Sequence, residues 1–113
     1  MALSLDKLYL VHILESIEKI EKYTEAGPAH FVNDEKTKDA VLRNLQVLAE
    51  STMRISKDLK DDYPNVLWRE IRGFRNIVVH DYLGVEFAKV WAIITEDLPA
   101  LKIAVESMIR KIG

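Results

Sequence analysis

Two side chains in the second half of the chain could carry out chemistry together. Arg75 and His80 are five residues apart. A guanidinium can hold a phosphate and stabilise the charge that develops on it, and an imidazole can move a proton near neutral pH. This pair is a sufficient minimum for cleaving an RNA phosphodiester, because the substrate's own 2′-hydroxyl is the nucleophile. Such a reaction requires neither a metal nor a cofactor, and we expect none.

The segment around this pair is predicted to be an amphipathic helix over residues 65–80, with Asn65 as its cap. Projected at about 100° per residue, it has one apolar face, which we expect in the core, and one cationic and polar face. The apolar face holds Leu67, Ile71, Phe74 and Val78, and the outward face holds Arg69, Arg72, Asn76, Val79 and His80. Arg75 lies near the boundary between them.

Arg75 and His80 diverge by about 140° on an ideal helix, so they cannot share one row. The helix must therefore end near His80, or two copies of the chain must complete one site. Spacing alone favours ordinary roles, because an outward Arg is usually solvated and a His at a helix C-terminus suits the helix dipole. The apolar Val79 on the outward face is better explained by a partner surface.

Composition sets the frame for these residues. The 113 residues are enough for a single domain, which we expect to cover residues 1–113. With no Cys there are no disulfides, thiolate metal sites or Cys nucleophiles, and the cytoplasm is the expected compartment. No apolar run approaches a membrane span, and we expect neither export nor a membrane anchor. The net charge of −2 restricts any polyanion site to a local patch.

Helical periodicity runs through the remaining sequence, and no period-two run suggests a strand. The first helix spans residues 3–24 and is ended by Gly27 and Pro28. Asn33 or Asp34 caps a long second helix, whose apolar positions continue to Leu59. Shorter helices are expected over residues 85–95, after a turn at Gly84, and from Pro99 onward. The predicted fold is an all-α antiparallel bundle of four to five helices.

The inward positions of these helices follow the same spacings. They are Leu3, Leu10, Ile13, Ile17 and Ile20 in the first helix, Val41, Leu45, Leu48, Thr52, Ile55 and Leu59 in the second, and Leu101, Val105, Met108 and Ile112 in the last.

Other polar residues are weaker candidates for a site. His12 and Glu15 have a helical spacing but lack the third and fourth ligands that a metal needs, and His30 falls in an expected loop without an evident partner. Glu50 lies between apolar positions, where an acid is either buried or faces a cleft, with an Arg of residues 65–80 as its expected partner. Trp68 and Trp91 are predicted to be packing residues.

Residues 75–82, with the sequence RNIVVHDY, resemble the Arg-polar-x-x-x-His-x-Tyr signature of HepT-like ribonuclease toxins, an all-helical branch of the HEPN superfamily. Six Arg and three His place an Arg five before a His about 0.16 times by chance, and a Tyr two residues later lowers this to about 0.006. The Tyr therefore carries the specificity. The resemblance extends over nearly the whole chain, from Tyr23 to the Leu98–Pro99 pair, with Ala49 replacing the Gly that such proteins often have.

The resemblance implies roles for individual residues. Arg75 and His80 would be the catalytic Arg-x4-His pair, supported by Asn76, while Arg72 is our own candidate for contacting the RNA strand. Tyr82 would accept AMP from an MntA-like nucleotidyltransferase antitoxin, in a type VII toxin–antitoxin system, and the AMP would block RNA cleavage. The family also implies a homodimer whose two motifs face one cleft.

Two other interpretations remain open at this stage. The chain could be a helical nucleotide-binding or phosphate-binding partner subunit of a minimal nucleotidyltransferase, in which Arg75 and His80 recognise phosphate and nothing is cleaved. It could also be a structural dimer in which the pair is incidental. Loss of RNA cleavage on replacing His80, without loss of folding, would distinguish the enzyme from both.

Overall fold

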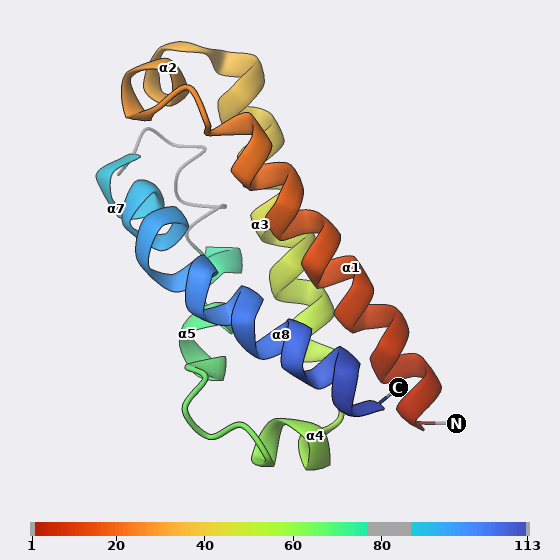
Figure 1. Ribbon diagram of the computed structural model, residues 1–113. Coiled ribbons are helices and arrows are strands. Elements are labelled where there is room, and N and C mark those ends of the chain that lie inside the picture. The colour runs from red at the N-terminus through yellow and green to blue at the C-terminus, as the bar shows by residue number, and fades with distance from the viewer. Residues whose placement is uncertain (1, 77–86, 113) are drawn as a thin grey trace.

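The computed structural model of the chain describes the backbone of residues 2–76 and 87–112 and the side chains of residues 5–76 and 87–112 (Figure 1). All regular structure in these ranges is helical, as predicted. None of the helices in this part of the chain is both long and apolar enough to cross a membrane.

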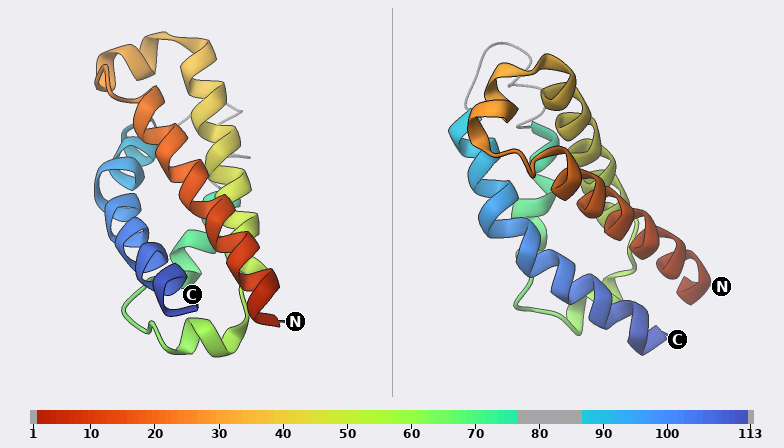
Figure 2. Two further views of the ribbon diagram at one scale, coloured as in Figure 1. Left: turned by 45° about the vertical axis from the view of Figure 1, so that its right-hand side comes forward. Right: turned by 45° about the horizontal axis from the view of Figure 1, so that its top comes forward.

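Helix α1, Ala2–Tyr23, is covered on two sides, by α3, Glu35–Met53, and by α8, Leu98–Ile112 (Figure 2). The predicted inward residues of α1 that are described are fully buried, namely Leu10, Ile13, Ile17 and Ile20. The predicted seam of α3 is buried too, as are Leu101, Val105 and Met108 of α8, whereas Ile112 is half-buried. Hydrophobic periodicity therefore predicted the three-helix core.

The connection between α1 and α3 contains a short helix that we had expected to be a loop. Gly27 has a φ of 98°, a left-handed conformation that glycine adopts without strain, and Pro28 then begins α2, Pro28–Asn33. Asp34 caps α3 as predicted, because its side chain accepts a hydrogen bond from the backbone N–H of Thr37.

The long helix predicted to continue to Leu59 is interrupted, and this prediction was wrong. The helix α3 ends at Met53, and the chain starts again as α4, Lys57–Asp61. The Ser56 hydroxyl accepts from the N–H of Leu59 and caps the new helix. Asp6 of α1, which is only 2% exposed, fixes this restart by accepting hydrogen bonds from the Ser56 N–H (2.8 Å) and hydroxyl (2.6 Å).

Helix α5, Trp68–Arg72, begins later than predicted. Its first flanking residue is Leu67, not Asn65, and Leu67 is 56% exposed instead of buried. The helix starts only after this residue, so the projection that placed Leu67 in the core does not apply to it. Ile71 and Phe74 are buried as predicted, and Val78 lies outside the described residues.

The C-terminal part is one continuous helical run instead of two helices. It comprises α7, Phe87–Ala92, the π-helical turn η1, Ile93–Asp97, and α8. Pro99 has no N–H to give to the carbonyl four residues earlier, and the N–H of Leu98 bonds five residues back to Ile93 in the wider π turn. The predicted turn at Gly84 lies outside the described residues.

We predict that Asp6→Ala destabilises the protein by about 1–3 kcal/mol, because the Ser56 N–H loses its buried acceptor and the start of α4 loses its anchor on α1. Urea denaturation followed by far-UV circular dichroism measures the change. Asp39→Ala, which removes an exposed carboxylate from α3, is the control and should leave stability nearly unchanged. Equal stability of the two variants would contradict the anchoring role of Asp6.

Candidate functional site

Arg75 lies on an open surface next to the end of α3. It belongs to residues 74–76, which are helical and follow a turn at Gly73 after α5. The side chain is exposed, and one of its terminal nitrogens, Nη1, lies 3.6 Å from the sulfur of Met53. Arg75 and Met53 line a cavity of about 420 Å³ together with Glu50 and Arg54. The guanidinium therefore faces a solvent-accessible cavity large enough for part of a nucleotide.

The other two residues of the predicted motif, His80 and Tyr82, lie outside the described residues. Their position relative to Arg75 is therefore still a prediction from the sequence.

Arg72 and Asn76, the two predicted supporting residues, lie on different sides of Arg75. Arg72 lines a second cavity, of about 370 Å³, together with Thr52, Met53, Lys60, Trp68 and Arg69. Met53 belongs to both walls, so this cavity adjoins the one at Arg75. Asn76 instead lines a third cavity, with Glu70, Gly73, Phe74, Lys89, Ala92, Ile93 and Asp97. The structure thus brings Arg72, and not Asn76, next to the Arg75 cavity.

Glu50 faces the cleft, which is one of the two positions predicted for it. It is half-buried on α3 and shares the cavity with Arg75, which is one of the Arg residues of the segment 65–80 that was expected to supply its partner. Its negative charge lies in the same cavity wall as Arg54 and Arg75 and partly offsets their positive charges. It is the only carboxylate among the described residues that line the two adjoining cavities.

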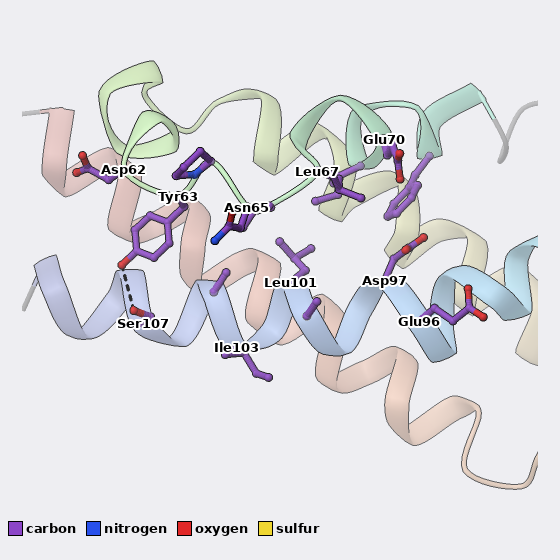
Figure 3. A pocket seen from close by; sticks show the side chains of 16 residues that line it. Asp62, Tyr63, Asn65, Leu67, Glu70, Glu96, Asp97, Leu101, Ile103 and Ser107 are labelled. Atoms are coloured by element: carbon purple, nitrogen blue, oxygen red, sulfur yellow. Dashed lines mark hydrogen bonds between the residues drawn. The ribbon is translucent and has the colours of Figure 1, made fainter.

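Among the cavities lined by described residues, one of about 530 Å³ exceeds those at Arg75, Arg72 and Asn76, and it lies between the η1–α8 run and the segment from Asp62 to Phe74 (Figure 3). Its walls carry four carboxylates, those of Asp62, Glu70, Glu96 and Asp97, and no Lys or Arg among the described lining residues. Leu67 and Ile103, which are both exposed, are among its apolar lining residues. Such a cavity repels a phosphate, so its size does not make it the site of phosphodiester chemistry.

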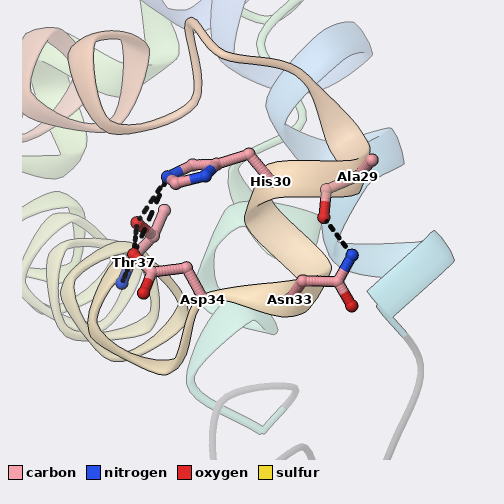
Figure 4. A network of polar contacts seen from close by, with 5 residues as sticks. All are labelled: Ala29, His30, Asn33, Asp34 and Thr37. Carbon is pink, nitrogen blue, oxygen red and sulfur yellow. Dashed lines mark hydrogen bonds and ion pairs between the residues drawn. The ribbon is translucent and has the colours of Figure 1, made fainter.

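The remaining candidates have structural roles. His30 lies in α2, not in a loop, and it does have partners, since its Nε2 is 3.4 Å from the Thr37 hydroxyl and 3.7 Å from Asp34 (Figure 4). The Thr37 side-chain hydrogen bond is the main cause that lowers the pKa of Asp34. His30 thus belongs to the junction of α2 and α3.

No group of three or more metal-ligating side chains occurs in the part of the chain that the structure describes, which includes His12 and Glu15. Trp68 and Trp91 are half-buried and pack against the core, as predicted. The indole N–H of Trp68 donates to the carbonyl of Tyr63 at 3.2 Å.

Comparison with known proteins identifies the family. Residues 13–108 match the ribonuclease HepT-like family. A Thermococcus cleftensis protein named "Probable ribonuclease HepT" is 39% identical over 97 residues, which cover 85% of this chain and 88% of that protein. The chain belongs to the HepT-like ribonuclease family. This confirms the predicted family and the predicted class of enzyme, a ribonuclease.

Two further relatives extend the likeness of this HepT-like chain to another archaeon and to a bacterium. A Methanocaldococcus jannaschii protein named "Putative RNase" is 36% identical, with 88% of this chain and 93% of that protein covered. A Caldanaerobacter subterraneus protein with the same name is 31% identical, with 91% and 93% covered. No solved structure matches the chain.

Two cationic residues that line the adjoining cavities were not singled out by the sequence analysis. Arg54 caps the C-terminus of α3, and Lys60 belongs to α4. Both follow from the interruption after Met53, which turns α4 toward α5. The sequence signal for this interruption is Ser56, a residue type that favours the N-cap position of a new helix.

We predict that Asp97→Asn stabilises this HepT-like protein at neutral pH. Burial, then Glu70 and Glu96, raise the pKa of Asp97, so its ionisation at pH 7 disfavours the folded state. Because Asp97 remains partly exposed, the free energy of unfolding should increase by less than about 1 kcal/mol.

The gain from Asp97→Asn should disappear as the pH falls below the ordinary Asp value of 3.8, where the wild-type carboxyl is protonated in both states. Urea denaturation at pH 7 and pH 3.5 measures both limits. Asp39→Asn is the control on the exposed face of α3, and an Asp97→Asn gain that is absent at pH 7 or independent of pH would contradict the crowding of these acids.

Proposed function

We propose that the protein is the metal-independent endoribonuclease toxin of a type VII HepT/MntA-like toxin–antitoxin system. Arg75 and His80 are its catalytic pair, and RNA is its substrate. The observation that carries the proposal is the placement of Arg75, whose guanidinium lines an open cavity beside further cations. Membership of the HepT-like ribonuclease family supports the RNA substrate.

Arg75 is suited to bind the scissile phosphate. Within the described part of the chain it forms no ion pair with a carboxylate, and its Nη1 contacts only the weakly accepting sulfur of Met53 among those side chains. A guanidinium in this state can give both of its N–H pairs to phosphate oxygens. As charge accumulates on those oxygens in the transition state, the same hydrogen bonds strengthen.

The reaction needs only one further group, which transfers protons. The 2′-oxygen attacks the phosphorus, its proton leaves, and the bond to the 5′-oxygen breaks as that oxygen gains a proton. His80 exchanges a proton with one of these two oxygens, because an imidazole is available in both forms near neutral pH. The products are a 2′,3′-cyclic phosphate and a 5′-hydroxyl, and all atoms of the substrate are retained.

Arg72 and Asn76 support this reaction in different ways. Arg72, in the adjoining cavity, contacts the RNA strand through a phosphate, whereas Asn76 supports the pair from the third cavity. The divergence of about 140° between positions 75 and 80 on an ideal helix is met by a homodimer in which two copies face one cleft.

Tyr82 is the regulatory residue in this proposal. An MntA-like nucleotidyltransferase antitoxin transfers AMP from ATP to its hydroxyl, with release of pyrophosphate. The attached nucleotide brings a phosphate close to Arg75 and occupies the place of a substrate nucleotide. Cleavage is then blocked by a group that resembles the substrate.

We predict that unmodified protein, expressed without an antitoxin, cleaves labelled RNA in excess EDTA and leaves 2′,3′-cyclic phosphate ends. His80→Ala and Arg75→Ala should each lower the rate by about 10²–10⁴-fold, because each removes proton transfer or charge stabilisation from the transition state. Gel electrophoresis with end-group analysis measures both rate and product.

Matched controls separate chemistry from folding in this test. His12→Ala and Arg43→Gln change the same residue types at exposed positions of α1 and α3 and should retain full activity. Circular dichroism checks that each variant is folded. Folded wild-type protein that cleaves no RNA, or a His80→Ala variant as active as wild type, would overturn the proposal and favour the phosphate-binding partner subunit.

We further predict that incubation with ATP and an MntA-like nucleotidyltransferase adds AMP to the wild-type protein and abolishes RNA cleavage. Tyr82→Phe lacks the acceptor oxygen and should stay unmodified and active. Intact mass spectrometry and the cleavage assay measure the two effects, and Tyr23→Phe is the control that should behave as wild type. Modification of Tyr82→Phe to the same extent would show that another residue is the acceptor.

A further inference from the structure

The cations of the protein are strongly segregated around Met53. Four of the six Arg, at positions 54, 69, 72 and 75, line the two cavities that share this residue, and Lys60 joins them. The whole chain carries a net charge of −2, so this cluster of positive charge is opposite in sign to the net charge of the protein. Positive charge therefore lies on one side of α5, and the four carboxylates of the acidic cavity of about 530 Å³ lie on the other side.

In the part of the chain that the structure describes, three lysines are paired with carboxylates and these five cations are not. Lys57, Lys102 and Lys111 each lie within 3.2 Å of a carboxylate oxygen. Over residues 5–76 and 87–112, none of Arg54, Lys60, Arg69, Arg72 and Arg75 forms such a pair, and Glu50 is the only acid on the described walls. The positive charge is therefore available to an external anion.

Lys60 shows how closely the cations are placed. Its pKa is lowered, first by burial and second by the charge of Arg72, while the carboxylate of Asp6 acts in the opposite direction. Asp6 is itself buried and committed to Ser56. A phosphate between Lys60 and Arg72 would relieve their repulsion and restore the preference of Lys60 for its charged form.

The position of Lys60 is set by the fold before any ligand binds. The helix that carries it is capped by Ser56 and anchored on α1 through Asp6. Its ammonium lies 5.7 Å from the ring centroid of Trp68, and the Trp68 indole is held by its hydrogen bond to Tyr63. A preorganised cation loses less entropy on binding than a free surface Lys.

We propose that Lys60, Arg69 and Arg72 form a second phosphate-binding site, which holds the backbone of the RNA strand next to the scissile phosphate at Arg75. This rests on the function proposed above and specifies the substrate as an RNA chain of several nucleotides, gripped on one side of the cut. The site reads the backbone and not the bases, because its ligands are phosphate oxygens. It sets affinity, while the Arg75–His80 pair sets the rate of the chemical step.

The test uses Lys60→Gln combined with Arg69→Gln, because Arg72 is already assigned to the active site. RNA binding is measured by fluorescence anisotropy with a labelled ten-nucleotide RNA in the His80→Ala background, where no cleavage interferes. Loss of two phosphate contacts should weaken binding at about 0.1 M salt by tenfold or more and reduce the slope of log K against log salt by about 1.4. The matched control is Lys57→Gln with Arg110→Gln, which removes the same charge from exposed positions outside the cavities.

Cleavage by proteins that retain His80 separates binding from chemistry. For the ten-nucleotide RNA, the double variant Lys60→Gln/Arg69→Gln should have a KM at least tenfold higher than that of the wild type, with kcat changed less than twofold. For a dinucleotide, which is too short to reach beyond Arg75, kcat/KM should change less than threefold. If the double variant lost as much kcat/KM for the dinucleotide as for the ten-nucleotide RNA, the proposal would be overturned. Lys60 and Arg69 would then belong to the site of cleavage itself.

The binding arm keeps this inference separate from the proposed function. If the Lys60→Gln/Arg69→Gln variant binds RNA with the same affinity and salt dependence as the Lys57→Gln/Arg110→Gln control, the second phosphate site is overturned. This holds whether or not the wild type cleaves RNA. Weakened binding together with a wild-type protein that cleaves no RNA would support the site and overturn only the nuclease. Circular dichroism confirms that both double variants are folded.

Discussion

The apolar stripe of α1 has to be covered on both sides, and much of the structure follows from this constraint. Leu10, Ile13, Ile17 and Ile20 are fully buried, and each such side chain contributes about 1.5–3 kcal/mol when it is removed from water. Two long helices, α3 and α8, provide the cover. With one face of α3 committed to α1, the side chains near its C-terminal end that point elsewhere, Glu50 and Met53, are left to form the wall of a cavity with Arg75.

Positive and negative side chains are separated on the two sides of α5. This five-residue helix separates a cationic cleft that can receive a polyanion from an acidic, apolar groove that cannot. A chain with a small negative net charge thereby keeps a local positive field where the family motif begins. For the function proposed above, this field would direct an RNA strand toward one side of the molecule before any specific contact is made.

The sequence predicted the core better than the borders of the helices, for a physical reason. Burial follows a period that survives an interruption, so Ile55 and Leu59 are inward as expected although the helix stops between Met53 and Lys57. Leu67 shows the converse, because an apolar residue just outside a helix start is not governed by that period. The π turn before Pro99 depends on which backbone donors are missing, and hydrophobic spacing does not report this.

Prediction of the site had the same limits. Arg75 and Arg72 are identified by a local motif and a helical projection, and the structure places them in adjoining cavities. Arg54 and Lys60 join them only through the way α4 turns after α3, which is a tertiary property. Arg72 and Asn76 are four residues apart and would share one face of a straight helix, but the turn at Gly73 lies between them and their side chains line different cavities.

The link between Asp6 and Ser56 also has a kinetic consequence. It joins residues 50 positions apart, so it can form only after a long loop has closed and α1 has docked on α3. The start of α4, and with it the placement of Lys60, is therefore fixed only after α1 and α3 have docked. An incompletely folded chain, or one still emerging from the ribosome, can contain the whole of α3 and still lack the cationic cleft.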